Sequence, residues 1–241
     1  MNNAVTMVSS QKNYITTLNK VNEVNFYIHI KRIIDILFSL TLLILFCIPM
    51  LIISLLIKIE DGETVLFKQK RTGKNGKNIY IYKFRSMIVE NDVRDLKCED
   101  KYTKVGKFIR KTSLDELPQI INILKGEMSF IGPRPWIPEY YENMNVMQRE
   151  RVKVLPGLTG LAQISGRNGI SINEKIVKDL EYVDKLSFKE DLKILIRTFT
   201  TIFEKENVYF LSKIDIDQES MLTELNTLSA FYHQLQKVHC F

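Results

Sequence analysis

The sequence predicts an α+β protein, mainly α-helical, that meets a membrane. Three observations indicate this fold class: a long uncharged run near the N-terminus, two strand-like segments around a tight-turn dipeptide, and several stretches with apolar residues at helical spacing. With 241 residues and 45% hydrophobic content, the chain can bury one sizeable core. We therefore expect one domain, with a membrane element and tails beside it.

The uncharged run covers the 22 residues from Ile36 to Ile57 and follows the pair Lys31-Arg32. As a straight helix it would measure about 33 Å, which is enough to cross a bilayer core. Pro49, however, removes a backbone hydrogen bond and clashes with the preceding turn, at a cost of about 3 kcal/mol. The segment is expected to bend, although an ordinary single span is also compatible with its length.

Basic residues lie on both sides of the run, so the positive-inside rule assigns both flanks to the cytoplasm. Lys31 and Arg32 precede it, and Lys58 follows it. A helix that enters, breaks at Pro49 and returns on the same side satisfies both flanks, provided that other parts of the protein or polar side chains cover the freed backbone groups. The side chains available for this are those of Ser39, Thr41 and Ser54.

A basic β-hairpin is expected after the membrane run. The segments 65–67 and 79–82 are strand-like and flank Asn75-Gly76, a dipeptide suited to the positive φ angles of a tight turn. From Thr64 to Val89 there are seven Lys or Arg and no acid, whereas the whole chain carries a net charge of +6. This stretch favours an anionic partner, but charge alone does not choose among nucleic acid, lipid headgroups and nucleotide phosphates.

Helical spacing predicts three helices further along. The segment 104–111 is basic and amphipathic, and it fits either a membrane surface or the protein core. The pattern over 117–124 stops at Gly126, a helix-ending signal. Ser187 and Glu190 form a capping box that opens a third helix. Its apolar stripe, expected in the core or on the membrane, consists of Leu192, Leu195, Ile196, Phe199 and Phe203.

Several kinds of chemistry are excluded by composition. Cys47, Cys98 and Cys240 are far apart and show neither a disulfide framework nor a zinc-site spacing. The three histidines lie in terminal segments or beside the membrane run. The glycine patterns match neither a dinucleotide fingerprint nor a Walker loop. Catalysis therefore has to use carboxylates, Lys, Arg or Tyr.

Asp115 and Glu116 are the strongest catalytic candidates. The two adjacent carboxylates follow several cations and could bind a divalent cation or attack phosphorus. The alternative is structural, because Ser113 and Glu116 have capping-box spacing. Pro118 weakens that alternative, since proline is tolerated in a first helical turn and places the helix start near Asp115.

Four cations are candidates for binding phosphate. Arg134 lies between two prolines that fix its backbone, and Arg167 is flanked by glycine and asparagine in a long loop. Lys83 and Arg85 share one face of a probable strand. Each of these positions is equally compatible with a solvated surface, so the residues alone leave both interpretations open.

Taken together, these segments resemble the bacterial sugar transferase family, the monotopic phosphoglycosyl transferases that start glycan assembly on polyprenol phosphate. The resemblance extends from about residue 31 to residue 204 and rests on the order of its motifs. These are Lys31-Arg-Ile-Ile-Asp35, Phe67-Lys-Gln-Lys-Arg71, Ile81-Tyr-Lys-Phe-Arg-Ser-Met87, Thr112-Ser-Leu-Asp-Glu-Leu-Pro-Gln119, the segment 124–135, Pro156-Gly-Leu-Thr-Gly-Leu-Ala-Gln163, Gly166-Arg-Asn168 and Asp191-Leu-Lys-Ile194.

The resemblance implies a two-step transfer. Asp115 would attack the β-phosphorus of a UDP-sugar and release UMP, and polyprenol (undecaprenyl) phosphate would then take the phosphosugar from the covalent intermediate. Glu116 would assist proton handling or ion placement, and Mg²⁺, held at Asp115, would neutralise the diphosphate. The positions that match the family's substrate pocket are Lys83, Arg110, Arg134, Arg167 and Asp179.

The resemblance also implies the placement of the chain. A re-entrant helix-break-helix over 29–60, with Lys31, Arg32 and Pro49 as its anchor, and amphipathic interface helices would hold the active site at the cytoplasmic face of the bacterial plasma membrane. The catalytic domain would cover 61–205.

Residues 1–28 are expected to form a flexible polar leader. The tail 206–241 could bind a second copy or glycan-assembly partners.

Two other functions stay open. A metal-dependent glycosyltransferase would release UDP, and a membrane-anchored basic adaptor would bind partners without catalysis. The sequence contains no recognisable nucleic-acid module, so we expect no nucleic-acid partner. The sugar is not fixed by the sequence, although the resemblance to compact members of the family implies an N-acetylated amino sugar.

Overall fold

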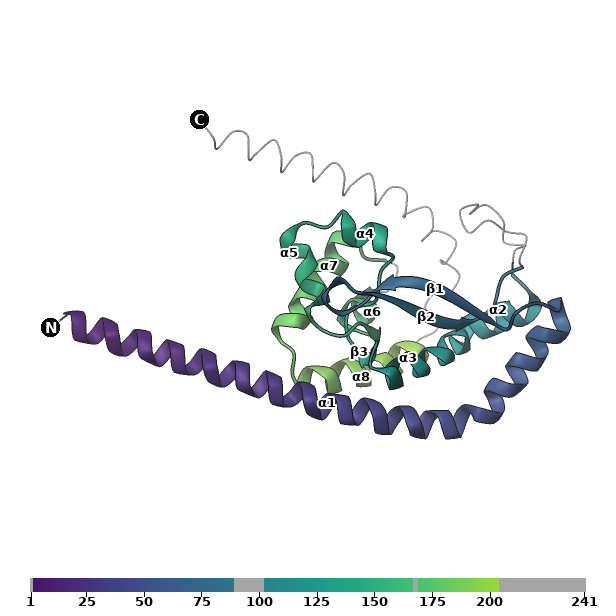
Figure 1. The fold of residues 1–241 in the computed structure, drawn as a ribbon, viewed down its shortest axis with the longest axis horizontal. Coiled ribbons are helices and arrows are strands. Elements are labelled where there is room, and N and C mark those ends of the chain that lie inside the picture. Colours follow the sequence, from purple (N-terminus) through teal and green to yellow (C-terminus); the bar gives the residue numbers. More distant parts are fainter. Residues whose placement is uncertain (1, 89–101, 167–168, 204–241) are drawn as a thin grey trace, which may run out of the picture.

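The computed structural model describes residues 2–88, 102–166 and 169–203. These residues form a mostly helical body with two small sheets, lying along one long N-terminal helix (Figure 1). The expected α+β class with a predominance of helix is thus confirmed. The tail 206–241 lies outside the described residues.

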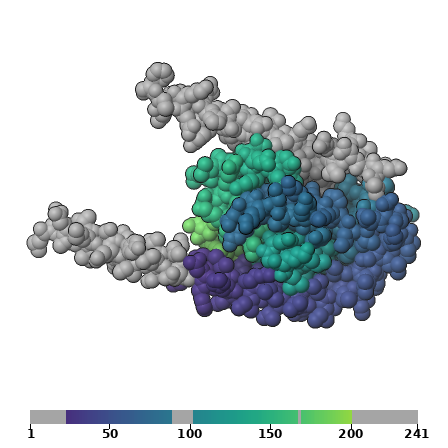
Figure 2. Space-filling model, viewed as in Figure 1, coloured from purple at the N-terminus to yellow at the C-terminus, as the bar shows by residue number. Residues whose placement is uncertain are grey.

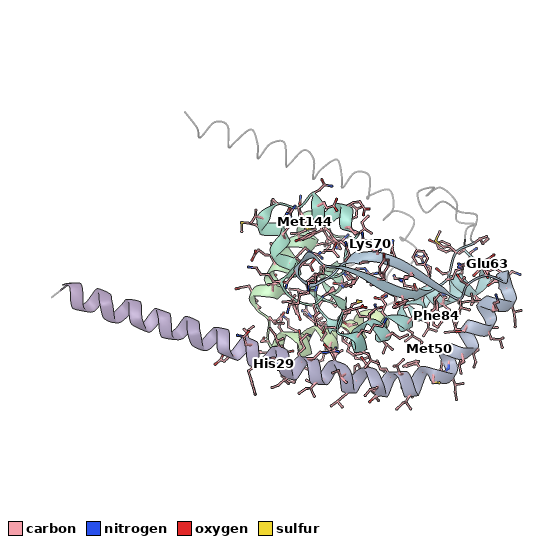
Figure 3. All side chains as sticks on the ribbon, in the orientation of Figure 1. His29, Met50, Glu63, Lys70, Phe84 and Met144 are labelled. Carbon is pink, nitrogen blue, oxygen red and sulfur yellow. The ribbon has the colours of Figure 1, made fainter. Side chains whose placement is uncertain are left out.

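Helix α1, Asn2–Asp61, is continuous and contains Pro49. It passes along one side of the body and turns toward the β-hairpin close to Met50 (Figures 1 and 3). Because an internal proline removes one hydrogen bond and crowds the preceding turn, a bend at this point is its ordinary effect. The structure therefore has a bent helix where we expected two helices separated by a break.

Residues 2–28 belong to the same helix α1, in contrast to the loose leader expected from their polar composition. Between residues 2 and 61 the sequence contains no glycine and no proline except Pro49. No strong helix-breaking residue therefore separates the polar segment from the apolar run. Composition predicted flexibility here because it ignores this continuity of the backbone.

The hydroxyl groups of the apolar run do not cover the carbonyl that Pro49 frees, which lies four residues before it. Thr41 and Ser54 donate over 3.0 and 2.7 Å to the carbonyls four residues before their own positions. Ser39 Oγ is buried and has no hydrogen-bond partner among the described residues. These three side chains therefore do not meet the condition set for a break at Pro49, and cover by other protein groups is the remaining way to meet it.

The predicted β-hairpin is confirmed. Strands β1, Leu66–Thr72, and β2, Asn78–Phe84, pair antiparallel along their full lengths. Asn75 and Gly76 adopt the expected positive φ angles of 57° and 76°. The connection is longer than a two-residue turn, because it includes the short 3-10 helix η1, Lys74–Gly76.

Three helical elements follow the hairpin: α2, Lys104–Lys111, η3, Leu114–Gln119, and α3, Ile120–Lys125. The predicted helix over 117–124 ends where expected, with Gly126 in the left-handed region at φ 82°. Its first part differs from the prediction, because Pro118 lies in a 3-10 helix and the α-helix begins only after it.

The remaining elements complete the body and position two short parallel strands at its centre. They are β3, Ser129–Ile131, α4, Pro138–Glu142, α5, Val146–Arg149, η4, Glu150–Lys153, β4, Gly157–Thr159, α6, Leu161–Gly166, α7, Ile172–Asp184, and α8, Phe188–Phe203. The largest buried cluster joins the hairpin, α3, β3, α6, α7 and α8 through Ile79, Ile81, Ile123, Met128, Phe130, Ile131, Leu161, Tyr182, Leu186 and Ile194.

Helix α8 begins next to Ser187, whose Oγ accepts a hydrogen bond from the Glu190 amide, so the predicted start is confirmed. Its core contact is Ile194, which is fully buried. The stripe predicted for this helix mostly faces outward. Leu192, Ile196 and Phe199 expose 43%, 57% and 53% of their surface.

Lys31 and Arg32 attach α1 to the body. Lys31 Nζ forms an ion pair with Asp191 of α8. The Arg32 guanidinium donates to the carbonyls of Ile123 and Leu124 over 2.5 and 2.7 Å, which adds donors to acceptors at the end of α3. The role that we expected for these two cations at the membrane stays a prediction, since both side chains bind protein here.

The outer side of the apolar run is uncovered. Among the described residues, Glu23–Asp61 forms one helix that is long and apolar enough to cross a membrane, and only 11% of its most apolar window is buried. Ile44, Ile48 and Leu55 expose 81%, 69% and 61% of their surface. Figure 2 shows α1 as the lower surface of the molecule, on the side away from α4 and α5. An apolar surface of this extent fits association with a membrane.

Candidate active site

The carboxylates Asp115 and Glu116 lie in the first turn of η3, at the helix start that the sequence predicted. Ser113 precedes them in the left-handed region at φ 58°, and it makes no side-chain capping bond. The capping-box alternative is therefore wrong. Glu116 is not used to close a helix end, and its side chain contacts other parts of the chain.

Glu116 brings together cations from two distant segments. Its Oε1 atom lies 2.7 Å from Lys83 Nζ, on strand β2, and 2.8 Å from Arg134 Nη2, on the loop after β3. The side chains of Lys83 and Glu116 are each 19% exposed, while that of Arg134 is 45% exposed. The three groups therefore form a half-open polar cluster, with Arg134 at its outer edge.

These contacts fix the charge state of Glu116. Burial alone would raise its pKa, but the charges of Arg134 and Lys83 and their hydrogen bonds hold the pKa well below its usual range. Burial lowers the pKa of Lys83, and Glu116 opposes that shift. The attraction of Glu116 raises the pKa of Arg134. Glu116 is consequently an ionised anchor for two cations.

The surroundings of the Asp115 carboxylate differ from those of Glu116. It is buried, and within the described part of the chain its carboxylate takes part in no hydrogen bond or ion pair. Burial raises its pKa, Lys83 opposes this, and the nearby charge of Glu116 adds to the rise. A buried carboxylate without partners is available to react or to bind a cation.

Arg110 and Arg71 add positive charge around the two carboxylates. Arg110, at the end of α2, lies over the Tyr102 ring at 4.7 Å from its centre, and its charge lowers the pKa of Asp115. Arg71, on β1, donates to Gln69 Oε1 over 2.6 and 3.1 Å. Burial and the charge of Arg134 lower the pKa of Arg71 to about 10.

Four cations thus surround the two carboxylates, and Glu139 adds a third acid beside Arg71. Within the described residues this leaves a surplus of positive charge even when all three acids are ionised. A surplus of like charges in a partly buried site is unfavourable until an anion arrives. The site therefore fits an anionic ligand with more than one negative charge, such as a diphosphate.

Arg71 was absent from the candidates chosen from the sequence. The predicted hairpin contained the signal that could have found it, because side chains alternate across a strand and Arg71 pairs with Ile79, which shares a face with Lys83. Once the register of the two strands is known, both cations fall on the same face.

Asp179 lies behind the Arg134 loop rather than beside the dyad. It is 1% exposed on α7, and its Oδ2 atom accepts from Arg151 Nη2 and Nε over 2.6 and 2.9 Å. Arg151 also donates from Nη2 to the Arg134 carbonyl over 2.7 Å. Direct contact between Asp179 and a substrate stays a prediction. Arg167, the remaining substrate-pocket candidate, lies outside the described residues.

The model of the bacterial sugar transferase family matches residues 26–205, which extends from the apolar part of α1 to the end of α8. This chain belongs to the bacterial sugar transferase family. The enzyme class expected from the sequence, a phosphoglycosyl transferase, is confirmed.

Several relatives of this sugar transferase have names of their own. It is 41% identical to the uncharacterized sugar transferase EpsL of Bacillus subtilis, over 74% of this chain and 90% of that protein. It is 36% identical to the UDP-glucose:undecaprenyl-phosphate glucose-1-phosphate transferase of Caulobacter vibrioides, over 74% of this chain and 72% of that protein. The exopolysaccharide production protein ExoY of Rhizobium meliloti is 36% identical, over 71% of this chain and 84% of that protein.

Some relatives are much longer than this sugar transferase. The galactosyl transferase CpsE of Streptococcus agalactiae is 45% identical over 59% of this chain, but the matched part is only 35% of that protein. The matched part accounts for most of EpsL and about a third of CpsE.

The residues of this sugar transferase fit a magnesium ion that is bound together with the substrate. No group of three or more His, Cys, Asp or Glu side chains gathers in the described ranges. Mg²⁺ is commonly bound by one or two carboxylates together with substrate phosphates. Asp115 offers a carboxylate that is unpaired among residues 2–88, 102–166 and 169–203, in a site that suits phosphate, so the donor set fits an ion that arrives with its substrate.

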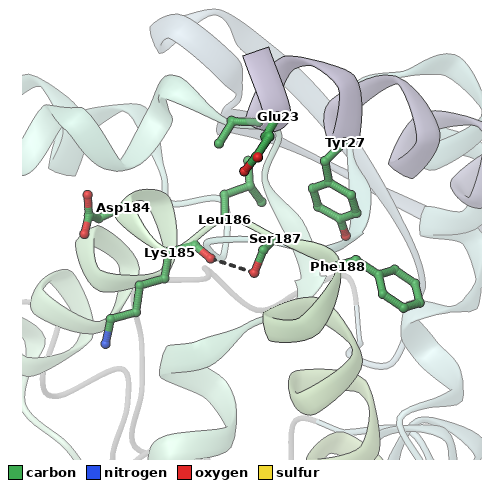
Figure 4. A pocket seen from close by; sticks show the side chains of 8 residues that line it. Glu23, Tyr27, Asp184, Lys185, Leu186, Ser187 and Phe188 are labelled. Carbon is green, nitrogen blue, oxygen red and sulfur yellow. Dashed lines mark hydrogen bonds between the residues drawn. The ribbon is translucent and has the colours of Figure 1, made fainter. Parts of the chain in front are cut away.

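The sugar transferase also has a recess away from the dyad. A cleft of about 510 Å³ lies between α1 and the connection from α7 to α8 (Figure 4). Glu23 and Tyr27 line it on one side and residues 184–188 on the other, and Ser187 Oγ donates to the Lys185 carbonyl over 3.1 Å. None of the candidate site residues lines this cleft.

Proposed function

We propose that this enzyme transfers a phosphosugar from a UDP-sugar to polyprenol (undecaprenyl) phosphate and produces polyprenol-diphosphate-sugar and UMP. The observation that carries the proposal is the contrast within the dyad. Glu116 is held by Lys83 and Arg134, whereas the buried Asp115 carboxylate has no hydrogen-bond or ion-pair partner among the described residues. A carboxylate of this kind beside a cluster of cations is suited to attack an anionic diphosphate.

In the first step, a carboxylate oxygen of Asp115 forms a bond to the β-phosphorus of the UDP-sugar. The bond between this phosphorus and the bridging oxygen breaks, and its electron pair leaves with UMP. In the second step, a phosphate oxygen of polyprenol phosphate attacks the same phosphorus. The bond to Asp115 breaks, which restores the carboxylate and releases the polyprenol-diphosphate-sugar.

The cations make the first step physically reasonable. A carboxylate and a diphosphate repel each other unless nearby positive charge offsets the repulsion and holds the reacting groups in line. Lys83 and Arg134 are fixed by Glu116 at the edge of the site, and Arg110 and Arg71 add further positive charge. When bound at Asp115, Mg²⁺ would neutralise part of the diphosphate charge.

We further propose that α1 is re-entrant and that the active site faces the cytoplasm at the membrane surface. The bend near Met50 and the uncovered apolar face of α1 support this placement. A soluble nucleotide sugar and a lipid-borne phosphate can meet at that level. Partners for the tail, or pairing of two copies through it, are proposed on the sequence alone.

The sugar and the pathway are proposed from the relatives. The names of three relatives state UDP-glucose as the donor, and a fourth is a galactosyl transferase. UDP-glucose and UDP-galactose are therefore the first donors to test, together with UDP-linked N-acetylated sugars. The name of ExoY supports a place in the first membrane step of exopolysaccharide assembly, with capsule, O-antigen and glycoprotein glycans as other destinations.

The test is a product assay in detergent with undecaprenyl phosphate and a panel of UDP-sugars. We expect UMP from at least one donor, loss of UMP in Asp115→Asn, and normal release in Glu142→Gln, which removes an exposed carboxylate. Release of UDP would indicate a glycosyltransferase of another class. The absence of both products with every donor would favour a membrane-anchored adaptor without catalysis.

A further inference from the structure

The loop that carries Arg134 is fixed to the body by backbone donors on either side of Arg134 and by a side-chain donor at Arg134 itself. On one side of Arg134, the Pro133 carbonyl accepts from the Gly157 amide over 2.9 Å. On the other side, the Trp136 carbonyl accepts from the Thr72 amide over 2.7 Å. Arg134 is different, because its carbonyl accepts from a side chain, the Arg151 guanidinium, over 2.7 Å.

Arg151 contacts this loop at two points while a third contact fixes its own orientation. Its guanidinium lies 4.3 Å from the centre of the Trp136 ring and donates to the Arg134 carbonyl. Nε and Nη2 both donate to Asp179 Oδ2, so the carboxylate sets the plane of the guanidinium. The cavity between Arg151 and the loop measures only about 10 Å³, so the loop rests directly on this group.

A buried ion pair of this kind is a poor source of stability. The side chains of Arg151 and Asp179 are each 2% exposed, so both charges have lost their contact with water. The cost of this loss is often as large as the attraction, and apolar replacements can be equally stable. What a forked pair provides more reliably is a fixed geometry for the groups that it touches.

We propose that Arg151, oriented by Asp179, is a positioning residue that holds Arg134 in place for the anionic substrate. The proposal rests on the proposed function, in which Arg134 binds the diphosphate. It also gives Asp179 a role behind the site, through Arg151 and the Arg134 backbone. The pair lies on η4 and α7, so elements outside the dyad and the hairpin add to the backbone bonds that Thr72 and Gly157 make with the loop.

The variant that tests the proposal replaces both charges together, Arg151→Met with Asp179→Leu. A single replacement would leave one buried charge without a partner and could prevent folding. Since a displacement of about 1 Å can cost a hundredfold in rate, we expect UMP release to fall about a hundredfold at an unchanged unfolding temperature. The matched control is Lys153→Met, which removes the 62% exposed cation of the same η4 and should leave the rate unchanged.

Coupling to Arg134 separates positioning from a general structural effect. In an Arg134→Gln background, the double replacement should cost little further activity, because the group that it positions is already gone. Arg151→Lys keeps the positive charge at this position but lacks the forked guanidinium. We therefore expect it to recover less than half of the rate that the double replacement loses. Equal and additive losses in both backgrounds would overturn the proposal.

Amide hydrogen exchange gives a readout that does not depend on the reaction. In the double variant, exchange should become faster in the peptide covering residues 129–137 and stay unchanged in the hairpin, residues 66–84. Unchanged exchange over 129–137 would overturn the positioning role even in an active enzyme. Faster exchange in a chain whose wild type releases no UMP would support the positioning role and contradict only the proposed function.

Discussion

Lys83 Nζ and Glu116 Oε1 lie 2.7 Å apart, although 33 positions separate the two residues in the chain. Lys83 belongs to the hairpin and Glu116 to η3, so this contact depends on the packing of β2 against η3. Arg134 then contacts the same oxygen over 2.8 Å. One carboxylate oxygen therefore joins three segments of the chain at the site that we propose for substrate.

The first prediction concerns this carboxylate. Glu116→Gln keeps the size of the side chain but removes the charge that holds Lys83 and Arg134, so both cations lose their common anchor. Because misplaced charge-stabilising groups typically cost about a hundredfold or more in rate, we expect kcat for UMP release to fall by at least that factor. Steady-state kinetics with the best UDP-sugar would measure it. A variant with at least a tenth of the wild-type rate would show that the anchor is unnecessary.

The second prediction concerns pH. The attacking form of Asp115 is its carboxylate, so kcat/KM should fall as pH drops through the pKa of this group. Burial raises the pKa of Asp115, which places this acid limb above the usual range near pH 4. The charge of Arg110 lowers the pKa of Asp115. Arg110→Gln should therefore move the limb to higher pH.

The control for this pH profile is Lys107→Gln. Lys107 lies on the same helix α2, is exposed, and is not among the charges that act on Asp115. Its replacement should leave the acid limb where the wild type has it. An equal shift in both variants would mean that overall charge, rather than the position of Arg110, controls the titration.

Local features of the fold were predictable from the sequence, and the reason is physical. Asn75-Gly76 and Gly126 act through their own φ angles, and Ser187 acts on an amide three residues away. Such signals need no knowledge of distant packing. The full extent of α1 was not predicted, because polar composition was given more weight than the absence of helix-breaking residues.

The site was only partly predictable. The motifs identified Asp115, Glu116, Lys83 and Arg134, but the convergence of two cations on one oxygen depends on tertiary packing. Arg151 was missed because it lies in a charged stretch, Gln148 to Lys153, that is typical of a solvated surface. Only the fold shows that it is 2% exposed.

The third prediction concerns the attachment of α1. Asp191 Oδ2 accepts from the Tyr27 hydroxyl over 2.5 Å and pairs with Lys31, and Oδ1 accepts from the Tyr182 hydroxyl over 2.7 Å. Asp191→Asn removes the charge that pairs directly with the partly buried Lys31 ammonium. We expect the free energy of unfolding to fall by about 1–3 kcal/mol, measured by chemical denaturation in detergent.

A surface acid provides the contrast for this measurement. Glu181 also contacts two lysines, Lys178 and Lys185, over 2.9 and 2.8 Å, but its side chain is 32% exposed. Exposed ion pairs contribute about 0–1 kcal/mol, so Glu181→Gln should change stability little. If the two variants lose equal stability, the Asp191 contacts do not fasten α1 to the body.

The fourth prediction concerns membrane topology. Single cysteines in place of Lys20 and Lys77, in a chain without its three native cysteines, mark the two flanks of the apolar run. If α1 is re-entrant, an impermeant thiol reagent should label both positions from the cytoplasmic side only. Labelling of the two positions from opposite sides would establish a single span and refute the proposed re-entrant placement.

The central claim is that Asp115 carries the phosphosugar between the two steps. The most direct measurement is mass spectrometry of the enzyme mixed with its UDP-sugar and Mg²⁺ in the absence of polyprenol phosphate. The account predicts one added phosphosugar on the peptide that contains Asp115, released by polyprenol phosphate and absent in Asp115→Asn. Full turnover with no adduct on that peptide, or an active Asp115→Asn enzyme, would contradict it.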